Sequence, residues 1–200
     1  LPFLGAAVLV TAAPGPDNLM VLSTGISRGR RHGVAFGLGC AVGCLSHTVL
    51  AALGVSALIA ASPAAFTALR ICGGLYLLWL GGKALRSRGA AFRPGVQRPD
   101  PLARLFARGL LANAMNPKVI LFFLAFLPQF VSAGRGGAGW QTLELGVLFA
   151  LQSAILFGAL GWFAGQVGAW LSRRPGAAAW LDRLAGGVFA ALGLRLLISR

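Results

Sequence analysis

Long apolar stretches alternate with short clusters of basic residues along the whole chain. A transmembrane helix needs about 20 consecutive, mainly apolar residues to cross roughly 30 Å of hydrocarbon. Six stretches meet this requirement, at residues 1–27, 34–61, 64–82, 105–131, 143–171 and 177–198. The pattern therefore predicts an all-α integral membrane protein with six transmembrane helices, a multi-pass protein that has the lipid bilayer as its surroundings.

The basic residues are unevenly divided among the connections between these stretches. Most lie in or beside the first, third and fifth connections, whereas the second and fourth hold only Arg70 and Arg135. Because cytoplasmic loops are enriched in Lys and Arg, we expect the odd-numbered connections in the cytoplasm and both termini outside. Arg195 and Arg200, near the C-terminus, argue against this orientation for the last helix.

The third connection, residues 83–104, is basic and rich in proline, a composition that breaks helices. It separates two halves, about residues 1–82 and 105–198, with three predicted helices each. Since three is an odd number, two similar halves must enter the membrane with opposite topology, as in many secondary transporters. We therefore expect residues 1–200 to form one transporter domain built from two inverted three-helix repeats.

The composition agrees with a chain that has little surface in water. Hydrophobic residues make up 57% of it and charged residues 11%, against about 25% charged in soluble domains. In a soluble protein the net charge of +14 would suggest nucleic acid, but these charges lie between apolar stretches. We therefore expect contact with the anionic lipid surface and no nucleic-acid partner. Leu1 already lies in an apolar stretch and is not methionine, so we expect further residues before it.

Proline and glycine interrupt the first and fourth predicted helices near their midpoints. The interruptions are Pro14-Gly15-Pro16-Asp17-Asn18 in the first helix and Asn113-Ala114-Met115-Asn116-Pro117-Lys118 in the fourth. Each break frees backbone groups, which must face protein or a polar cavity. Matched breaks in the two halves indicate a binding site at the middle of the membrane. The expected substrate site comprises Pro14, Gly15, Pro16, Asp17, Asn18, Asn113, Asn116, Pro117 and Lys118.

An acid and a base, Asp17 and Lys118, lie at these two breaks. Lys118 is roughly 20 Å from either end of its predicted helix, too far for its side chain to reach the membrane surface. In one interpretation the two residues have no ligand and form either an internal ion pair or structural packing at the proline kinks. Because ionisable residues inside a membrane are functional candidates, we favour a zwitterionic cargo. Lys118 and freed amides would bind its carboxylate, while Asp17, Asn18 and free carbonyls would bind an ammonium group or a proton.

Other polar residues lie deep in the predicted helices. Cys40, Cys44 and His47 share one face of the second helix, but a metal site would need further thiolate or carboxylate ligands. We predict no metal site and a packing role for the cysteines. Histidine titrates near neutral pH, so Asp17 and His47 are candidates for a proton relay. Gln152 lies deep in the fifth helix and can line the transport pathway.

Two other classes of function, an intramembrane enzyme and an exporter of metal or inorganic ions, fit the sequence less well than transport of a zwitterion. An intramembrane enzyme would need a His-Glu-x-x-His helix, a Gly-x-Ser-x-Gly turn or a cluster of acids and thiols, and the sequence has none of these. We therefore expect no enzymatic activity and no cofactor. An exporter of metal or inorganic ions would favour several acidic or thiol ligands at the site, and only one deep acid is present.

Several motifs, in order and spacing, resemble one family of bacterial exporters. They are Pro14-Gly15-Pro16, the glycines Gly29, Gly33, Gly37, Gly39 and Gly43, the stretch from Gly73 to Gly81, Asn116-Pro117-Lys118, Phe122-Phe123 and Leu127-Pro128-Gln129-Phe130. Together they resemble the LysE/RhtB family of amino-acid exporters, the homoserine, threonine and lysine efflux type. The resemblance implies a six-helix protein of the bacterial plasma (inner) membrane that exports amino acids or their derivatives in exchange for protons. The glycine faces permit a homodimer.

Overall fold

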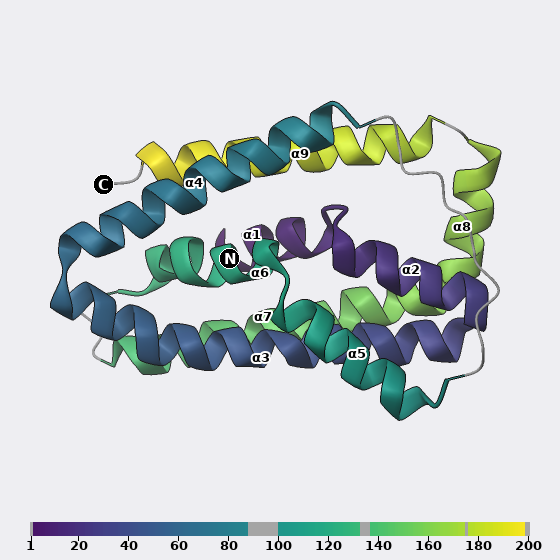
Figure 1. Ribbon diagram of the computed structural model, residues 1–200, viewed down its shortest axis with the longest axis horizontal. Helices are drawn as coiled ribbons and strands as arrows, with labels where there is room; N and C mark the ends of the chain where they lie inside the picture. Colours follow the sequence, from purple (N-terminus) through teal and green to yellow (C-terminus); the bar gives the residue numbers. More distant parts are fainter. Residues whose placement is uncertain (1, 88–99, 133–136, 175, 199–200) are drawn as a thin grey trace.

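The computed structural model describes residues 2–87, 100–132, 137–174 and 176–198 (Figure 1). All regular structure in this described part is helical. The helices are α1 (Pro2–Ala12), α2 (Pro16–Arg28), α3 (Arg30–Ala61), α4 (Pro63–Leu85), α5 (Leu102–Ala114), α6 (Pro117–Leu121), the π-helix η1 (Phe122–Phe126), the 3-10 helix η2 (Leu127–Phe130), α7 (Ala138–Trp162), α8 (Ala164–Arg173) and α9 (Ala177–Ile198). The prediction of an all-helical chain with long apolar helices is confirmed.

The long helices form two antiparallel pairs with the interrupted helices between them (Figure 1). α3 packs along α7 and α5, and α4 packs along α9 on the opposite side of the molecule. α1, α2 and α6 lie between these pairs, and α8 connects α7 to α9. A cluster of buried aromatic side chains from α1, η1 and α7 lies in the core beside the helix breaks. These contacts hold η1, which directly follows α6, against α7.

Glycine allows the close contacts of α3. A Cβ atom added at Gly39 would lie 2.0 Å from the carbonyl oxygen of Phe106 on α5, and one added at Gly109 would lie 2.1 Å from that of Phe36. Real side chains cannot approach so closely, so only glycine lets these two backbones touch. The glycine face of α3 therefore packs against another helix of the same chain.

Some of the described helices are long and apolar enough to cross a membrane. α3 over Arg30–Gly54 and α7 are long and apolar enough, and the pair α5 with Pro117–Phe130, bent by 50°, would make a third span. α1 is apolar but has only 11 residues. The count of six spans therefore stays a prediction.

Two predicted boundaries are wrong. The fifth apolar stretch, 143–171, is not one helix, because the backbone turns at Phe163, after which α8 leaves the direction of α7. The buried Ala164 follows this turn, where the absence of a side chain on Gly25 leaves it room. The loop predicted at 83–104 is helical at both ends, because α4 continues to Leu85 and α5 begins directly after Pro101. Its residues 88–99 lie outside the described residues, as do Arg135 and Arg200.

Candidate functional site

The first break separates α1 from α2 at Pro14 and Gly15. In a continuous helix the amide of residue 14 would bond to the carbonyl of Val10, but proline has no N–H. The Nζ of Lys118 donates to that carbonyl and to the carbonyl of Ala13, both at 3.1 Å. A lysine from the second half of the chain thus replaces the hydrogen bond that Pro14 cannot make, and its positive charge lies at the negative end of α1.

Gly15 provides the space for this contact. A Cβ atom at Gly15 would lie 2.9 Å from the Nζ of Lys118. The backbone of Gly15 is extended, at φ −169°, so the residue is glycine for reasons of space. Gly15 also offers no side chain to cap the amides that begin α2. The N-terminus of α2, with Asp17 in its first turn, is therefore available for a negatively charged group.

The second break separates α5 from α6 at Met115 and Asn116. Pro117 lacks the N–H that would bond to the carbonyl of Asn113, and the Nε2 of His47 on α3 donates to that carbonyl at 3.1 Å. The side chain of Asn116 accepts from the amide of Lys118 at 3.0 Å and caps α6. Each break therefore receives a side-chain donor from the other half of the chain.

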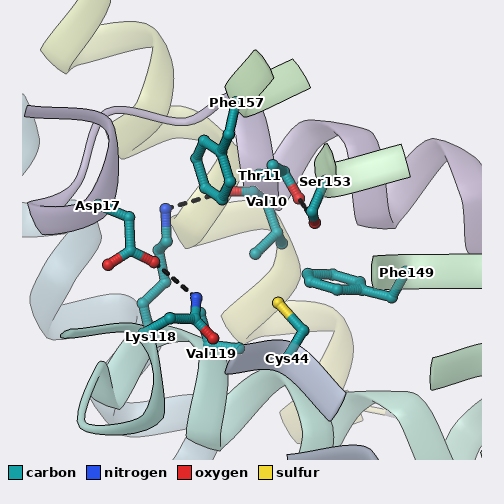
Figure 2. Close-up of a pocket in the computed structure, with 10 residues that line it drawn as sticks. Val10, Thr11, Asp17, Cys44, Lys118, Val119, Phe149, Ser153 and Phe157 are labelled. Carbon is teal, nitrogen blue, oxygen red and sulfur yellow. Dashed lines mark hydrogen bonds between the residues drawn. The ribbon is translucent and has the colours of Figure 1, made fainter. Parts of the chain in front are cut away.

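The opposite charges of the site line one small cavity between the breaks (Figure 2). Its free volume is about 10 Å³, room for roughly one water molecule, so the structure is closed around the site. Figure 2 shows Asp17 and Lys118 at one end and Thr11 and Ser153 toward the other. The lining residues are Val10, Thr11, Asp17, Cys44, Asn113, Lys118, Val119, Phe149, Ser153 and Phe157.

Asp17 and Lys118 are both buried, with 1% and 4% of their surface exposed. Among the described residues they form no ion pair with each other, so the ion pair is not seen in this structure. The other interpretation without a ligand, packing at the proline breaks, agrees with the hydrogen bonds of Lys118 to the backbone carbonyls. The Nδ2 of Asn113 donates to Oδ2 of Asp17 at 2.7 Å. Within the described part of the chain, Oδ1 of Asp17, Oδ1 of Asn113 and Oδ1 of Asn18 have no hydrogen-bond partner. The site therefore contains hydrogen-bond acceptors that no donor reaches, and leaving such buried groups unpaired lowers the stability of the protein.

The remaining predicted residues lie close to this arrangement. Pro16 begins α2, and Asn18 donates through Nδ2 to the carbonyl of Thr11 at 2.9 Å. His47 does not contact Asp17 directly; it also lines a second cavity of about 130 Å³ with Leu50 and Phe123. Cys44 lines the site cavity as a free thiol. In the described residues no group of three or more His, Cys, Asp or Glu side chains is placed to hold a metal ion.

Sequence reasoning missed Thr11 and Ser153 and did not connect them with Gln152. The Nε2 of Gln152 lies 2.8 Å from both hydroxyl oxygens. A polar pair at Gln152-Ser153 within an otherwise apolar helix was the available signal. Thr11 lies one turn before Pro14, and its partner on α7 could be found only from the tertiary structure.

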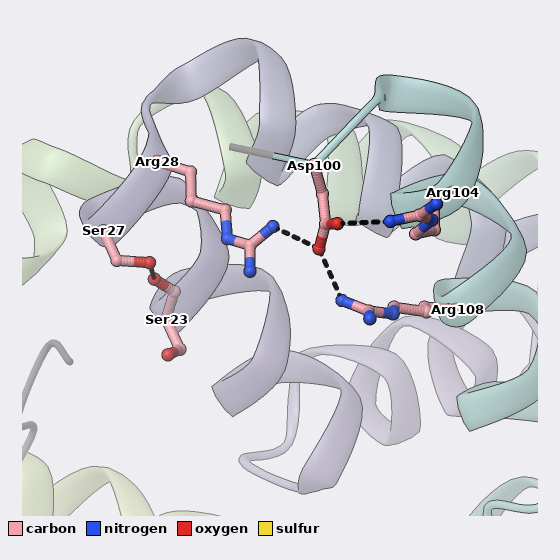
Figure 3. Close-up of polar contacts among 6 residues, drawn as sticks. All are labelled: Ser23, Ser27, Arg28, Asp100, Arg104 and Arg108. Atoms are coloured by element: carbon pink, nitrogen blue, oxygen red, sulfur yellow. Dashed lines mark hydrogen bonds and ion pairs between the residues drawn. The ribbon is translucent and has the colours of Figure 1, made fainter. Parts of the chain in front are cut away.

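A second charged cluster joins the other ends of the interrupted helices (Figure 3). Asp100 precedes α5 and forms ion pairs with Arg28 at 2.7 Å, Arg104 at 3.1 Å and Arg108 at 2.6 Å. Arg28 is the last residue of α2. The hydrogen bond from Arg28, together with those from the other arginines, lowers the pKa of Asp100 from its ordinary value. The cluster therefore links α2 to α5 on the basic side of the molecule.

Comparison with known proteins places these features in a wider group. The sequence model of the LysE type translocator family matches residues 8–200. The threonine efflux protein of Escherichia coli is 34% identical, over 96% of this chain and 94% of its own length. The leucine efflux protein of an Enterobacter species is 35% identical over 78% and 76%. The homoserine/homoserine lactone efflux protein of Salmonella typhimurium is 30% identical over 99% and 95%. No solved structure matches the chain significantly.

Proposed function

The chain belongs to the LysE type translocator family, and on this premise we propose that it is a secondary transporter that exports amino acids or their derivatives. It is a membrane protein, and its relatives in this family are named as efflux proteins. The observation that carries the proposal is the pair of buried opposite charges that line one cavity without pairing. A zwitterion supplies the missing partner of each charge.

We propose that the cargo binds with its two α-groups between the helix breaks. Its carboxylate lies between the ammonium of Lys118 and the uncapped amides of α2, where the helix dipole favours negative charge. Its ammonium donates to Oδ1 of Asp17 and Oδ1 of Asn113, the acceptors that have no partner in the closed structure. Pro14, Pro16, Asn116 and Pro117 keep both breaks open to this contact.

The proposed architecture is a single domain of six transmembrane helices in two inverted repeats, with the first and fourth helices broken. The pairing of corresponding helices supports it, because α3 packs on α7 and α4 packs on α9. The exchange of donors supports it too, since Lys118 serves the break of the first half and His47 that of the second. We place this domain in the bacterial plasma (inner) membrane.

Exchange with protons is the coupling that we propose. Asp17 is the titratable acid of the cavity, so a proton can replace the cargo ammonium there. His47 would take part in proton transfer through Asn113. Its Nε2 contacts the carbonyl of Asn113, and the side chain of Asn113 donates to Asp17. Export of a metal or inorganic ion is less favoured, because the described residues hold no cluster of ligands for one. A homodimer is a separate proposal, to be tested by the oligomeric state in detergent.

The proposal is tested by efflux from liposomes loaded with a panel of amino acids and metal ions, with and without a pH gradient. We expect gradient-dependent efflux of amino acids and none of the metal ions. Lys118→Met removes the charge at the site and should lower efflux by roughly 10- to 100-fold, the effect of losing one or two charge-assisted hydrogen bonds.

Lys83→Met is the matched control, because Lys83 is exposed on α4 and its Nζ lies over the ring of Trp79, away from the cavity. This variant should retain efflux. Unchanged efflux in folded and inserted Lys118→Met protein would contradict the proposed site. The absence of any gradient-dependent flux in the unmodified protein would contradict the transport function.

A further inference from the structure

A second polar group lines the same cavity, away from the charged pair (Figure 2). The hydroxyl oxygens of Thr11 on α1 and Ser153 on α7 are 3.3 Å apart, and Gln152 on α7 donates to both. Their exposed fractions are 3%, 0% and 7%. Thr11 and Ser153, from the two halves of the chain, thus line the end of the cavity away from Asp17, and Gln152 bonds to both of them.

The hydrogen bonds of this cluster are unevenly satisfied. The two protons of Nε2 of Gln152 face three acceptors: the two hydroxyls and the carbonyl of Phe149. In the described part of the chain, Oε1 of the same amide has no partner. Rotating the amide by half a turn exchanges its two ends but leaves one of them unpaired. The cluster therefore lacks one hydrogen-bonding group, although a buried amide normally has its partners.

The charges that line the cavity restrict which kind of cargo side chain can supply the missing hydrogen-bonding group. Asp17 and Lys118 are the only acidic and basic side chains among the described lining residues. If the α-ammonium and α-carboxylate of a cargo occupy them, a third charge would be buried without a partner, which is costly. The side chain of the cargo must therefore be uncharged and must still form hydrogen bonds. A hydroxyl group meets both conditions, since it donates one hydrogen bond and accepts others.

We propose that Thr11, Gln152 and Ser153 bind the side chain of the cargo and select a small neutral amino acid that carries a hydroxyl group. This inference rests on the proposed function, because it takes the α-groups to lie at Asp17 and Lys118. The closed cavity holds roughly one water molecule, so α1 and α7 must separate for the cargo to enter. The cargo hydroxyl then takes up the hydrogen bonds that Thr11 forms with Ser153 and Gln152 in the closed structure.

Threonine and valine provide the test, because they have nearly the same shape and differ by one hydroxyl group. Binding is measured by the rise in unfolding temperature of the purified protein with each amino acid, and transport by efflux from liposomes. In the unmodified protein we expect threonine to bind and move roughly tenfold better than valine, since valine leaves buried polar groups unpaired. Thr11→Val and Ser153→Ala should each reduce this ratio to about twofold while valine efflux continues.

Thr142→Val is the matched control. Thr142 is also buried on α7, but its hydroxyl donates to the carbonyl of Ala138 in its own helix, so the ratio should stay roughly tenfold. If Thr11→Val fails to fold, Ser153→Ala decides alone. Equal binding of threonine and valine by the unmodified protein, or an unchanged ratio in these variants, overturns the subsite and leaves amino-acid export standing. Preferential threonine binding without any flux overturns the proposed function instead.

Discussion

The two helix breaks have the same backbone chemistry, but different side chains satisfy their freed backbone groups. In both, a proline removes the amide that would bond to the carbonyl four residues earlier, and a side chain from the other half donates to that carbonyl. At the first break the donor is the charged Lys118, and the following helix has no side-chain cap. At the second break the donor is His47, and Asn116 caps the following helix.

This difference indicates which break offers the proposed cargo a free helix end. At the second break Asn116 caps α6 and His47 donates to the freed carbonyl, and these contacts support Lys118 and Asn113. Among the described residues, Oδ1 of Asn113 and Nδ2 of Asn116 are the side-chain atoms of this break that have no partner. The first break keeps an uncapped helix end, and the acid beside it has an oxygen without a partner. In the proposed site both halves therefore contact the cargo, and the first break adds an uncapped helix end.

The largest effect that would test this comparison is expected at Gly15. Gly15→Ala places a methyl group against the Nζ of Lys118, which two hydrogen bonds hold in position. We expect efflux to fall by roughly tenfold or more, because a misplaced charge loses its contact with the cargo. Gly5→Ala in α1 is the control, since an added Cβ there meets nothing within 4 Å. Equal efflux in the two variants would argue against Gly15 as a contact of the site.

A smaller effect is expected at His47. His47→Leu removes this donor, while the amide of Asn116 still donates to the carbonyl of Asn113, so the free energy of unfolding should fall by up to about 1.5 kcal/mol. His47→Gln retains a donor but cannot titrate. If His47 only supports the break, the glutamine variant keeps the stability and the pH dependence of efflux. A changed pH dependence in this variant would instead favour the proton relay and weaken the distinction between the two breaks.

Loss of the cap at Asn116 should cost less. Asn116→Ala removes the acceptor for the amide of Lys118, and N-cap losses typically lower stability by about 1 kcal/mol. Asn116→Ser keeps an uncharged side chain that can cap the helix and serves as the comparison. Thermal unfolding in detergent measures both variants. A loss in the serine variant as large as that in the alanine variant would show that the cap is not what Asn116 contributes.

The smallest effect concerns the Asp100 cluster, which joins the far ends of the two broken helices. Its pKa is lower in the folded protein than in the unfolded chain, so its stabilisation is complete above the unfolded pKa of about 4. The stabilisation is lost as the pH falls through the folded pKa. The unfolding temperatures of the unmodified protein and Asp100→Asn should therefore differ at neutral pH and converge below about pH 4. Parallel curves would show that the ion pairs contribute nothing.

Much of the fold was predictable because its signals are local. Apolar length and the prolines predicted long helices, and the interruptions lie where the runs at Pro14 and Asn116 indicated them. The match to the LysE type translocator family confirms the resemblance that those motifs carried. The end of α7 was not predictable, because residues 163–171 are apolar enough to continue the helix. The turn at Phe163 depends on the packing of α8 against α2, which lies far away in the sequence.

Residue types and their order along the chain specify an apolar helical protein, two proline breaks and a charged side chain at each of them. These properties depend on residue type and near neighbours, which a single chain displays directly. Only the tertiary structure decided that Lys118 bonds to the carbonyls of α1 and not to Asp17, that His47 completes the other break, and that Thr11 meets Gln152 and Ser153. A carbonyl freed by proline can accept from any donor that packing brings near, so its partner follows from the fold.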